Sequence, residues 1–245
     1  ALGGMNHPKV VPALVRALED NRYSSYHGSR VDQEAKMALV RLRDPASIEL
    51  VIPLLSHAQV DVASMAAEVL ASIKSPRVAE VFAERLVASP HVELRKRLAG
   101  ALAEYKDARS VDALIKALKD VDDGVCIAVT AELLEVGDKR SVAALLQESR
   151  NIKRKPAAAE VLVKALVQLK EVDGLIELLG DPRDNVCALA AAALGASLNA
   201  GKALPAIIRE AKNQKRQQQA SKSLVGALRH FKAVDALIEL LGDPR

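Results

Sequence analysis

The feature that most constrains this chain is an internal repeat, in which one apolar pattern returns about every 31 residues in about seven copies. Each copy contains a leucine, called here the marker leucine, with a small or aliphatic residue both four and eight positions before it. Residues at i, i+4 and i+8 lie on one face of an α-helix. A fixed period of this length predicts a stacked array whose units bury their apolar faces against their neighbours. The marker leucines are Leu39, Leu70, Leu102, Leu133, Leu166, Leu194 and Leu228.

A second, shorter apolar segment precedes each marker helix. In one clear unit, the sequence predicts a first helix over 111–119, an aspartate-rich turn over 120–124 and a second helix over 125–136 that ends at Gly137. The chain is therefore predicted to be all-α, a right-handed α-solenoid of about seven helix pairs. The short segments are Val11–Leu18, Ile48–Leu55, Val78–Leu86, Val111–Leu118, Val142–Leu146, Val172–Leu179, Leu204–Ile208 and Val234–Leu241.

The rhythm V-x-x-L-x-x-x-L-x-D, followed by V-x-x-A-x-x-x-x-L, resembles the HEAT-like repeat of phycobilisome lyase proteins and of armadillo-type α-solenoids. The resemblance covers nearly the whole chain and implies the fold, but it says little about activity. In that family an arginine commonly follows the valine that opens the second helix, and here only Arg95 matches. The resemblance alone also suggests, as a weaker alternative, a phycobilin lyase-type or phycobilisome-associated factor.

A longer period of about 62 residues overlies the first. Residues 172–183 and 234–245 differ at a single position, and Asn151 to Arg154 correspond to Asn213 to Arg216. The chain opens on what reads as the tail of a helix and ends in the middle of a unit. We therefore interpret residues 1–245 as a single array cut from a longer solenoid, with partial repeats at both ends. The apolar flank of its last unit leads us to expect end-to-end self-association.

Positive charge is concentrated in some of the turns, and acidic turns lie between them. Nucleic acid or another acidic partner is one class of ligand for such clusters, because Lys and Arg along a groove can follow phosphates. The other interpretation is a set of solvated loops that keep an apolar array soluble. The basic candidates are Arg95, Lys96, Arg97, Arg150, Lys153, Arg154, Lys155, Lys212, Lys215 and Arg216.

One inter-helix segment, over 21–29, is longer than the others and contains Tyr23, Tyr26 and His27. Insertions in repeat proteins fall in loops, often on the binding face, and tyrosine is favoured in contact surfaces. These three residues are therefore binding candidates. The alternative is an insertion that a surface loop tolerates without a function.

The sequence contains no recognisable catalytic or cofactor motif. It lacks a glycine-rich phosphate loop, G-x-S-x-G and H-E-x-x-H. The histidines are dispersed, without the His-Glu pairs that helical-repeat deoxyhypusine hydroxylases use for iron. The absence of tryptophan argues against the base recognition of helical-repeat DNA glycosylases. We expect no enzymatic activity, no cofactor and no metal.

The cysteines and the hydropathy bear on the compartment. Cys126 and Cys187 occupy equivalent places two repeats apart, about 20 Å, so they are predicted to be buried thiols and not a disulfide. Unpaired thiols favour a reducing compartment, and no apolar run is long enough for a membrane span. We expect a cytoplasmic protein, although a signal peptide upstream of Ala1 would change this expectation.

The predicted function is that of a protein-binding scaffold or adaptor, with a protein or peptide as its partner. The alternative is a nucleic-acid-binding helical-repeat protein that uses the basic clusters.

Overall fold

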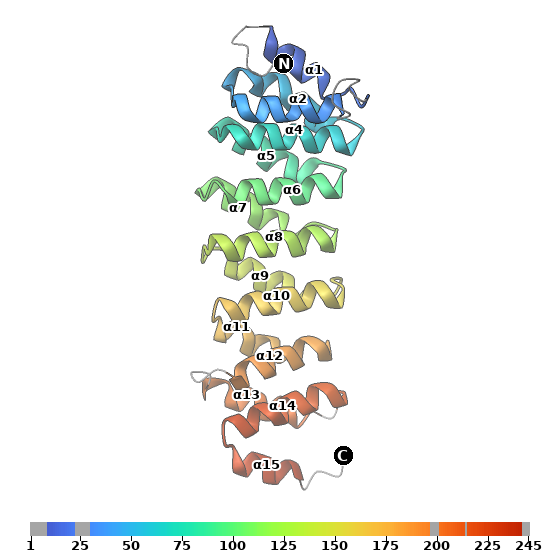
Figure 1. Ribbon diagram of the computed structural model, residues 1–245. Helices are drawn as coiled ribbons and strands as arrows, with labels where there is room; N and C mark the ends of the chain where they lie inside the picture. The colour runs from blue at the N-terminus through green and yellow to red at the C-terminus, as the bar shows by residue number, and fades with distance from the viewer. Residues whose placement is uncertain (1–8, 23–29, 197–200, 214, 242–245) are drawn as a thin grey trace. The chain divides into compact units, whose positions relative to one another are not determined.

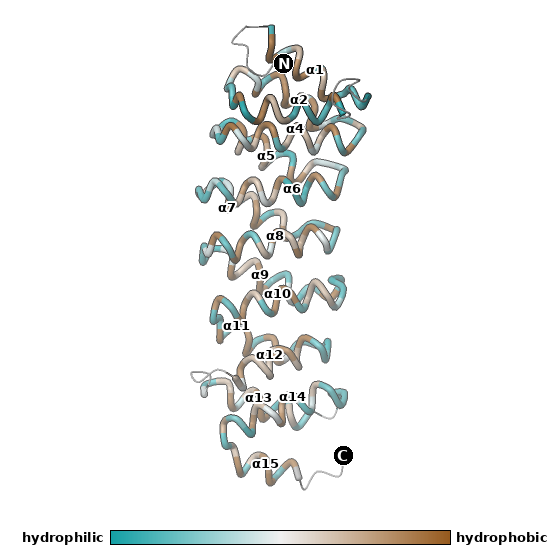
Figure 2. The backbone as a smooth tube through the Cα atoms, viewed as in Figure 1, coloured by the Kyte–Doolittle hydropathy of each residue, from teal (hydrophilic) through white to brown (hydrophobic). Residues whose placement is uncertain are grey.

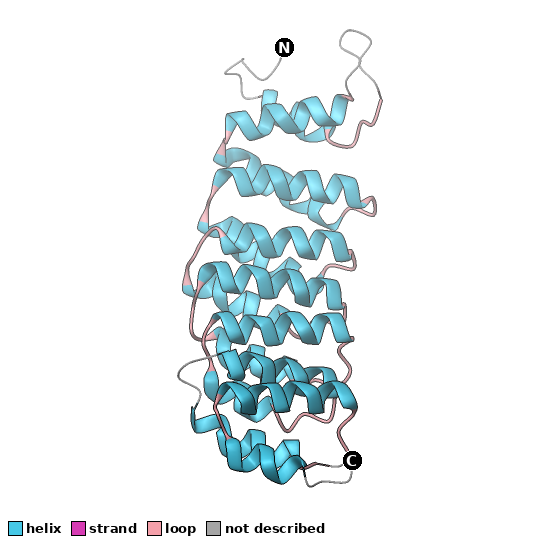
Figure 3. Cartoon of the chain, turned by 60° about the horizontal axis from the view of Figure 1, so that its bottom comes forward, coloured by secondary structure: helices cyan, strands magenta, loops and turns pink. Residues whose placement is uncertain are grey.

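The computed structural model describes residues 9–22, 30–196, 201–213 and 215–241. These residues form helices joined by short connections, with no β-strand among them (Figure 3). The helices alternate between a first helix of each pair, called here the A helix, and a second helix, called the B helix. The connection from A to B is the A–B loop. The chain divides into two compact units, Ala1–Glu132 and Leu133–Arg245, and the boundary falls within one B helix.

In the first unit, the B helices α2, α4 and α6 pack one after another in chain order (Figure 1). The A helices α5 and α7 pack side by side, and α1, α3 and α5 each contact their own B helix. The A helices are α1 (Val10–Ala17), α3 (Ile48–Val51), α5 (Pro76–Ala88) and α7 (Ala108–Ala117), and the B helices are α2 (Val31–Leu42), α4 (Val60–Ile73), α6 (Val92–Ala103) and α8 (Asp123–Val136). The short 3-10 helices η2 (Pro45–Ser47) and η3 (Ile52–Ser56) flank α3.

The second unit repeats the same arrangement. Its B helices α10, α12 and α14 pack in series, and each A helix lies against a neighbouring B helix. The A helices are α9 (Ser141–Ser149), α11 (Val172–Leu178), α13 (Leu204–Ala211) and α15 (Val234–Leu241), the B helices are α10 (Pro156–Gln168), α12 (Asp184–Ala196) and α14 (Gln218–His230), and η4 (Gly201–Ala203) precedes α13.

The core of each unit is built from the predicted apolar faces. Every marker leucine is buried, from Leu39 at 2% exposure to Leu228 at 0%. The small or aliphatic residues four and eight positions earlier, such as Ala158 and Leu162 before Leu166, are buried as well, except for the half-buried Val31 in the first repeat. Brown and teal segments alternate along the helices in Figure 2, as expected for amphipathic helices with one apolar face. The predicted all-α array and the register of its repeats are confirmed.

One predicted A helix differs from the expected continuous helix. The segment Ile48–Leu55 forms α3 and then continues as η3, with Pro53 in the first turn of the 3-10 helix. Proline lacks the backbone N–H and crowds the carbonyl four residues earlier, so it interrupts an α-helix. The chain still buries Val51 and Leu55, which keeps this repeat in register.

The B helices end in a common way. A residue in the left-handed region of backbone conformation follows each of the B helices α2, α4, α6, α8, α10 and α14. One of these residues is a glycine, Gly137 at φ +70°, which the sequence predicted as the end of its helix. Left-handed residues close the last helical turn and redirect the chain. The other five are Arg43, Lys74, Lys106, Lys170 and Lys232, at φ between 48° and 58°. Among the described residues, none of the helices is both long and apolar enough to cross a bilayer.

Candidate functional site

The A–B loops of the second unit are held together by arginines that reach the preceding loop. Arg183 donates to the backbone carbonyls of Ser149, the last residue of α9, and of Asn151 in the loop that follows it. The same guanidinium pairs with Asp181 in its own loop, with an Nη2–Oδ2 distance of 2.8 Å. Carbonyls at the C-terminal end of an A helix have no partner within the helix, so an arginine can satisfy them. We call such an arrangement, an arginine that binds an acidic side chain and the end of an A helix, an arginine bracket.

Arg216 forms the next bracket along the chain. Its guanidinium donates to the carbonyls of Asp181 and Leu179 at 2.5 and 2.7 Å, and to Oε2 of Glu210 at 2.8 Å. Burial alone would raise the pKa of Glu210, but the hydrogen bonds from Arg216 and Asn213 outweigh burial and bring the pKa below its usual value. Burial would likewise lower the pKa of Arg216, and its hydrogen bond to Glu210 raises it above normal. The pair is therefore ionised. Through its contacts with the two carbonyls, Arg216 joins its own repeat to the preceding one.

Arg154 is the counterpart of Arg216 one 62-residue period earlier. Its Nη2 lies 2.9 Å from Oε2 of Glu148, and both side chains are buried. Asn151 donates to the same carboxylate, as Asn213 does to Glu210. The longer period of the sequence thus corresponds to a repeated polar cluster, and not only to a repeated apolar face.

The first unit has a bracket built differently. Arg95, at the start of α6, donates from Nε to Asp120 at 2.7 Å and from Nη2 at 3.0 Å, a bidentate ion pair. Its Nη1 donates to the carbonyl of Ser89 at the end of α5. Asp120 also accepts from the backbone N–H of Asp122, and Asp122 caps Val125. The loop between α7 and α8 is therefore fixed at several points.

The structure separates the basic residues that the sequence grouped together. Arg95 and Arg216 are bracket arginines and Arg154 pairs with Glu148, and the guanidinium groups of all three are buried or nearly so. Four others form exposed ion pairs: Lys96 with Glu93, Arg97 with Glu68, Arg150 with Glu177 and Lys212 with Glu239. Lys153, Lys155 and Lys215 are exposed in their loops. Tyr23, Tyr26 and His27 lie outside the described residues.

Sequence reasoning missed the acidic partners of the brackets. Glu148 and Glu210 occupy equivalent positions six residues before Arg154 and Arg216, and Asp120 and Asp181 both follow an A helix. The signal was present, because these acids recur with the arginines at fixed spacing. From the sequence alone, this spacing was interpreted as an alternation of basic and acidic surface, whereas the arginines and their acidic partners belong to the same buried clusters.

A depression lies beside the Arg95–Asp120 bracket, between the ends of α5 and α7. It encloses about 350 Å³. Two of its aliphatic residues are unusually exposed, Val121 at 96% and Val87 at 62%. Lys116 and Lys119 stand at its rim, and among the residues that the structure describes neither takes part in an ion pair. We call it the Val121 depression; its aliphatic lining residues are Leu86, Val87, Ala117 and Val121.

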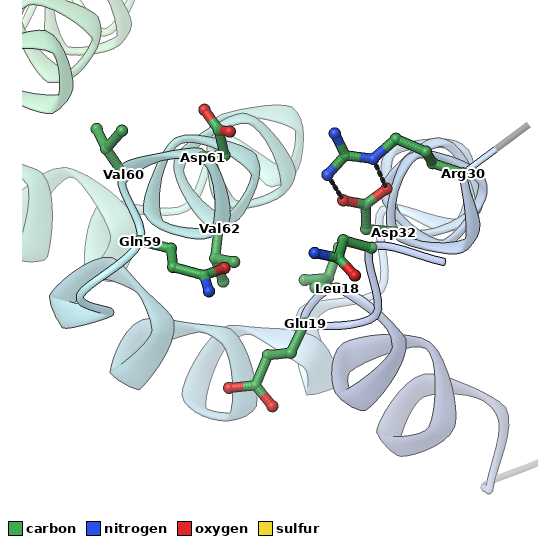
Figure 4. A pocket seen from close by; sticks show the side chains of 9 residues that line it. Leu18, Glu19, Arg30, Asp32, Gln59, Val60, Asp61 and Val62 are labelled. Carbon is green, nitrogen blue, oxygen red and sulfur yellow. Dashed lines mark hydrogen bonds and ion pairs between the residues drawn. The ribbon is translucent and has the colours of Figure 1, made fainter. Parts of the chain in front are cut away.

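A second depression of about 360 Å³ lies near the first two repeats, where α1 ends and where α2 and α4 begin (Figure 4). Arg30 and Asp32 face each other there as a bidentate pair, with nitrogen–oxygen distances of 3.1 and 2.5 Å. Because that pair is neutral overall, Glu19 and Asp61 give the lining a net negative charge. We call it the acidic depression. The two depressions therefore differ in the sign of their charge.

The described residues offer little for covalent or metal chemistry. No group of three or more His, Cys, Asp or Glu is placed to hold a metal ion within the described ranges. Both cysteines are buried and neither forms a disulfide, as predicted. Burial raises the pKa of Cys187 to about 11, so this thiol is protonated at neutral pH and a poor nucleophile.

Comparison with known proteins agrees with the geometry. The family model for HEAT repeats matches residues 79–163, which span α5 to α10. No curated protein matches the sequence. Among solved structures, the E. coli protein YibA is similar over 97% of this chain and 94% of its own, at 15% identity and a TM-score of 0.52. This likeness shows the fold alone. The match to the family model identifies HEAT repeats over residues 79–163.

Two further similar structures are of proteins named as enzymes. Human deoxyhypusine hydroxylase, in complex with glycerol, matches 95% of this chain and 88% of its own at 19% identity and a TM-score of 0.42. The complex of CpcE and CpcF of phycocyanin lyase from Nostoc sp. matches 94% of this chain and 83% of its own at 16% identity and a TM-score of 0.39. The prediction that the chain is not an enzyme is therefore wrong as drawn, because helical-repeat architecture does not separate binding proteins from enzymes.

Proposed function

We propose that this chain is a protein-binding scaffold and that it holds a protein partner at the A–B loops of its first unit. The observation that carries the proposal is the Val121 depression, where aliphatic side chains are exposed beside a fixed loop. Val121 is almost completely exposed although its neighbours Asp120 and Asp122 are tied to Arg95 and to the start of α8. An apolar side chain that is both exposed and held in place favours a contact with another protein.

The state of the arginines favours a protein partner over nucleic acid. Phosphate binding needs cations that can reach the solvent. Arg95 and Arg216 are instead committed to carboxylates and backbone carbonyls inside their units, and Arg154 to the carboxylate of Glu148. Most of the remaining candidates are exposed lysines and arginines already in ion pairs. The sites available for protein contact are aliphatic, as at Val87 and Val121.

The test is a selection of peptides from a random display library on the immobilised 245-residue chain. The scaffold proposal predicts that a recurrent peptide motif is enriched, and that the enriched peptides bind the chain in solution. A parallel selection on the variant Val121→Asp, Val87→Asp shows whether binding maps to this part of the chain. If no peptide is enriched and single-stranded oligonucleotides bind instead, the proposal is wrong.

A further inference from the structure

We infer that the Val121 depression takes an aliphatic side chain of the partner that stands next to carboxylates in the partner's sequence. This inference rests on the proposed function and specifies the chemistry of the bound segment. It follows from three properties of the depression: what lines it, which charges surround it, and how firmly its walls are held.

The lining is aliphatic and of the right scale for a side chain. Val87 and Val121 provide exposed apolar surface beside the buried Leu86 and Ala117, and the volume of about 350 Å³ lies at the lower end of the range for small ligand pockets. No aromatic residue lines the depression, whereas single-stranded nucleic acids are usually held by stacking of bases on aromatic rings. A leucine, isoleucine or valine of a partner fits this surface better than a base does.

The residues that line the depression carry a net positive charge. Asp120 is neutralised by its bidentate pair with Arg95, so it contributes little field to the solvent side. Lys116 and Lys119 are exposed on the rim. The net charge of the lining residues is therefore +2, from Arg95, Lys116 and Lys119 against Asp120. Carboxylates beside the aliphatic anchor would approach these lysines and speed the encounter with the partner.

The walls are held before any partner arrives. Arg95 ties the end of α5, through the carbonyl of Ser89 at 2.8 Å, to Asp120 after α7. The backbone N–H of Asp122 donates to Asp120 at 2.8 Å on the other side of Val121. Because both flanks of Val121 are fixed, binding loses little conformational entropy in the loop. Arg95 acts here as a positioning residue that holds the depression open without contacting the partner.

The probe is a fluorescein-labelled nine-residue peptide with one central leucine and glutamates on both sides, measured by fluorescence anisotropy with the 245-residue chain. Matched peptides replace the leucine with serine or the glutamates with glutamines. The protein variants are Val121→Ser and the pair Lys116→Glu, Lys119→Glu. Their matched controls in the second unit are Ile152→Ser, an exposed aliphatic loop residue, and the pair Lys153→Glu, Lys215→Glu.

We expect Val121→Ser to weaken binding about three- to tenfold. The paired lysine reversal should weaken it about fivefold or more and flatten its salt dependence. The control variants should stay within about twofold of the parent, and the serine and glutamine peptides should bind more weakly than the probe. Since all substituted side chains are exposed, melting followed by circular dichroism should be unchanged in every variant.

Equal losses in the test and control variants would overturn the inference, as would an oligonucleotide that competes with the probe for the same lysines. If the probe does not bind while display-selected peptides do, the inference about the Val121 depression is wrong and the scaffold proposal stands. If neither binds, both are wrong.

Discussion

The bracket arginines show how one side chain can connect two neighbouring repeats. Arg216 satisfies two carbonyls of the preceding repeat and one carboxylate of its own. Breaking a buried ion pair on one side leaves an uncompensated charge, which is strongly destabilising. The bracket therefore ties its repeat to the preceding one, because the same guanidinium meets the carbonyls of Leu179 and Asp181 and the carboxylate of Glu210.

At this scale we predict the effect of Glu210→Gln on stability as a function of pH. The folded pKa of Glu210 is lowered, so its contribution is fully present above its ordinary pKa of 4.5 and is lost as the pH falls through the lowered value. Urea unfolding at neutral pH should show a loss of about 1.5–3 kcal/mol, the range for hydrogen bonds to charged groups. The difference between variant and parent should shrink at acidic pH.

The matched control is Glu239→Gln, which removes the exposed partner of Lys212. An exposed pair contributes about 0–1 kcal/mol, so this variant should remain close to the parent. A loss for Glu210→Gln that stays the same at neutral and acidic pH would contradict the assignment of an ionised pair.

The residues of the core could be predicted from the sequence, and the residues of the brackets could not. Leu166 is recognisable because burial follows from helical periodicity, which is a local property of the chain. Arg95 finds Asp120 across 25 residues, and that pairing depends on how two repeats meet. The sequence placed Arg95 in a basic cluster with Lys96 and Arg97, although the three side chains have three different carboxylate partners.

Among the elements, α12 and α14 meet most closely at a glycine. A Cβ built on Gly195 would lie 2.8 Å from the Cα of Ala227 and 3.0 Å from its Cβ. These distances are too short for a real contact, and one of the clashing atoms is backbone, so the helices would have to separate. Gly226, within α14, has no neighbour within 4 Å of such a Cβ.

The two glycines therefore predict opposite effects of the same substitution. Gly226→Ala should stabilise the chain by about 0.5–1 kcal/mol, because alanine has the higher helix propensity and nothing obstructs it. Gly195→Ala gains the same propensity but overpacks the contact, and we expect a net loss of about 1–3 kcal/mol. Thermal and urea unfolding of both variants check the pair. A stabilised Gly195→Ala would show that α12 and α14 do not approach as described.

Helix positions could largely be predicted from the repeat, since the pattern fixes which residues must face the core. The predicted second helix over 125–136 begins two residues earlier, at Asp123. The break at Pro53 required knowledge of local geometry, because the apolar spacing there continues without change. The close approach at Gly195 could not be predicted, since it depends on the distance between helices from different repeats.

At the scale of the whole molecule, each unit is assembled from contacts between neighbouring repeats. We propose that α15 promotes self-association, because Val234 and Ile238 are 60% and 61% exposed on a helix whose sequence closely repeats that of α11. Sedimentation velocity should detect oligomers that increase with concentration. Val234→Glu with Ile238→Glu should restore the monomer, whereas Lys222→Glu, a charge change on α14, should not. A parent chain that is monomeric at all concentrations would contradict this.

The fixed A–B loop beside the Val121 depression has a consequence for proteolysis. A protease cuts a surface loop only after drawing it into an extended conformation, so loops that unfold locally are cut first. Lys119 offers trypsin an exposed cleavage position, but the chain that follows is held by Arg95 through Asp120 and by the cap from Asp122 to Val125. This loop should therefore resist trypsin despite its exposure, and removal of the Arg95 guanidinium should open it to cleavage.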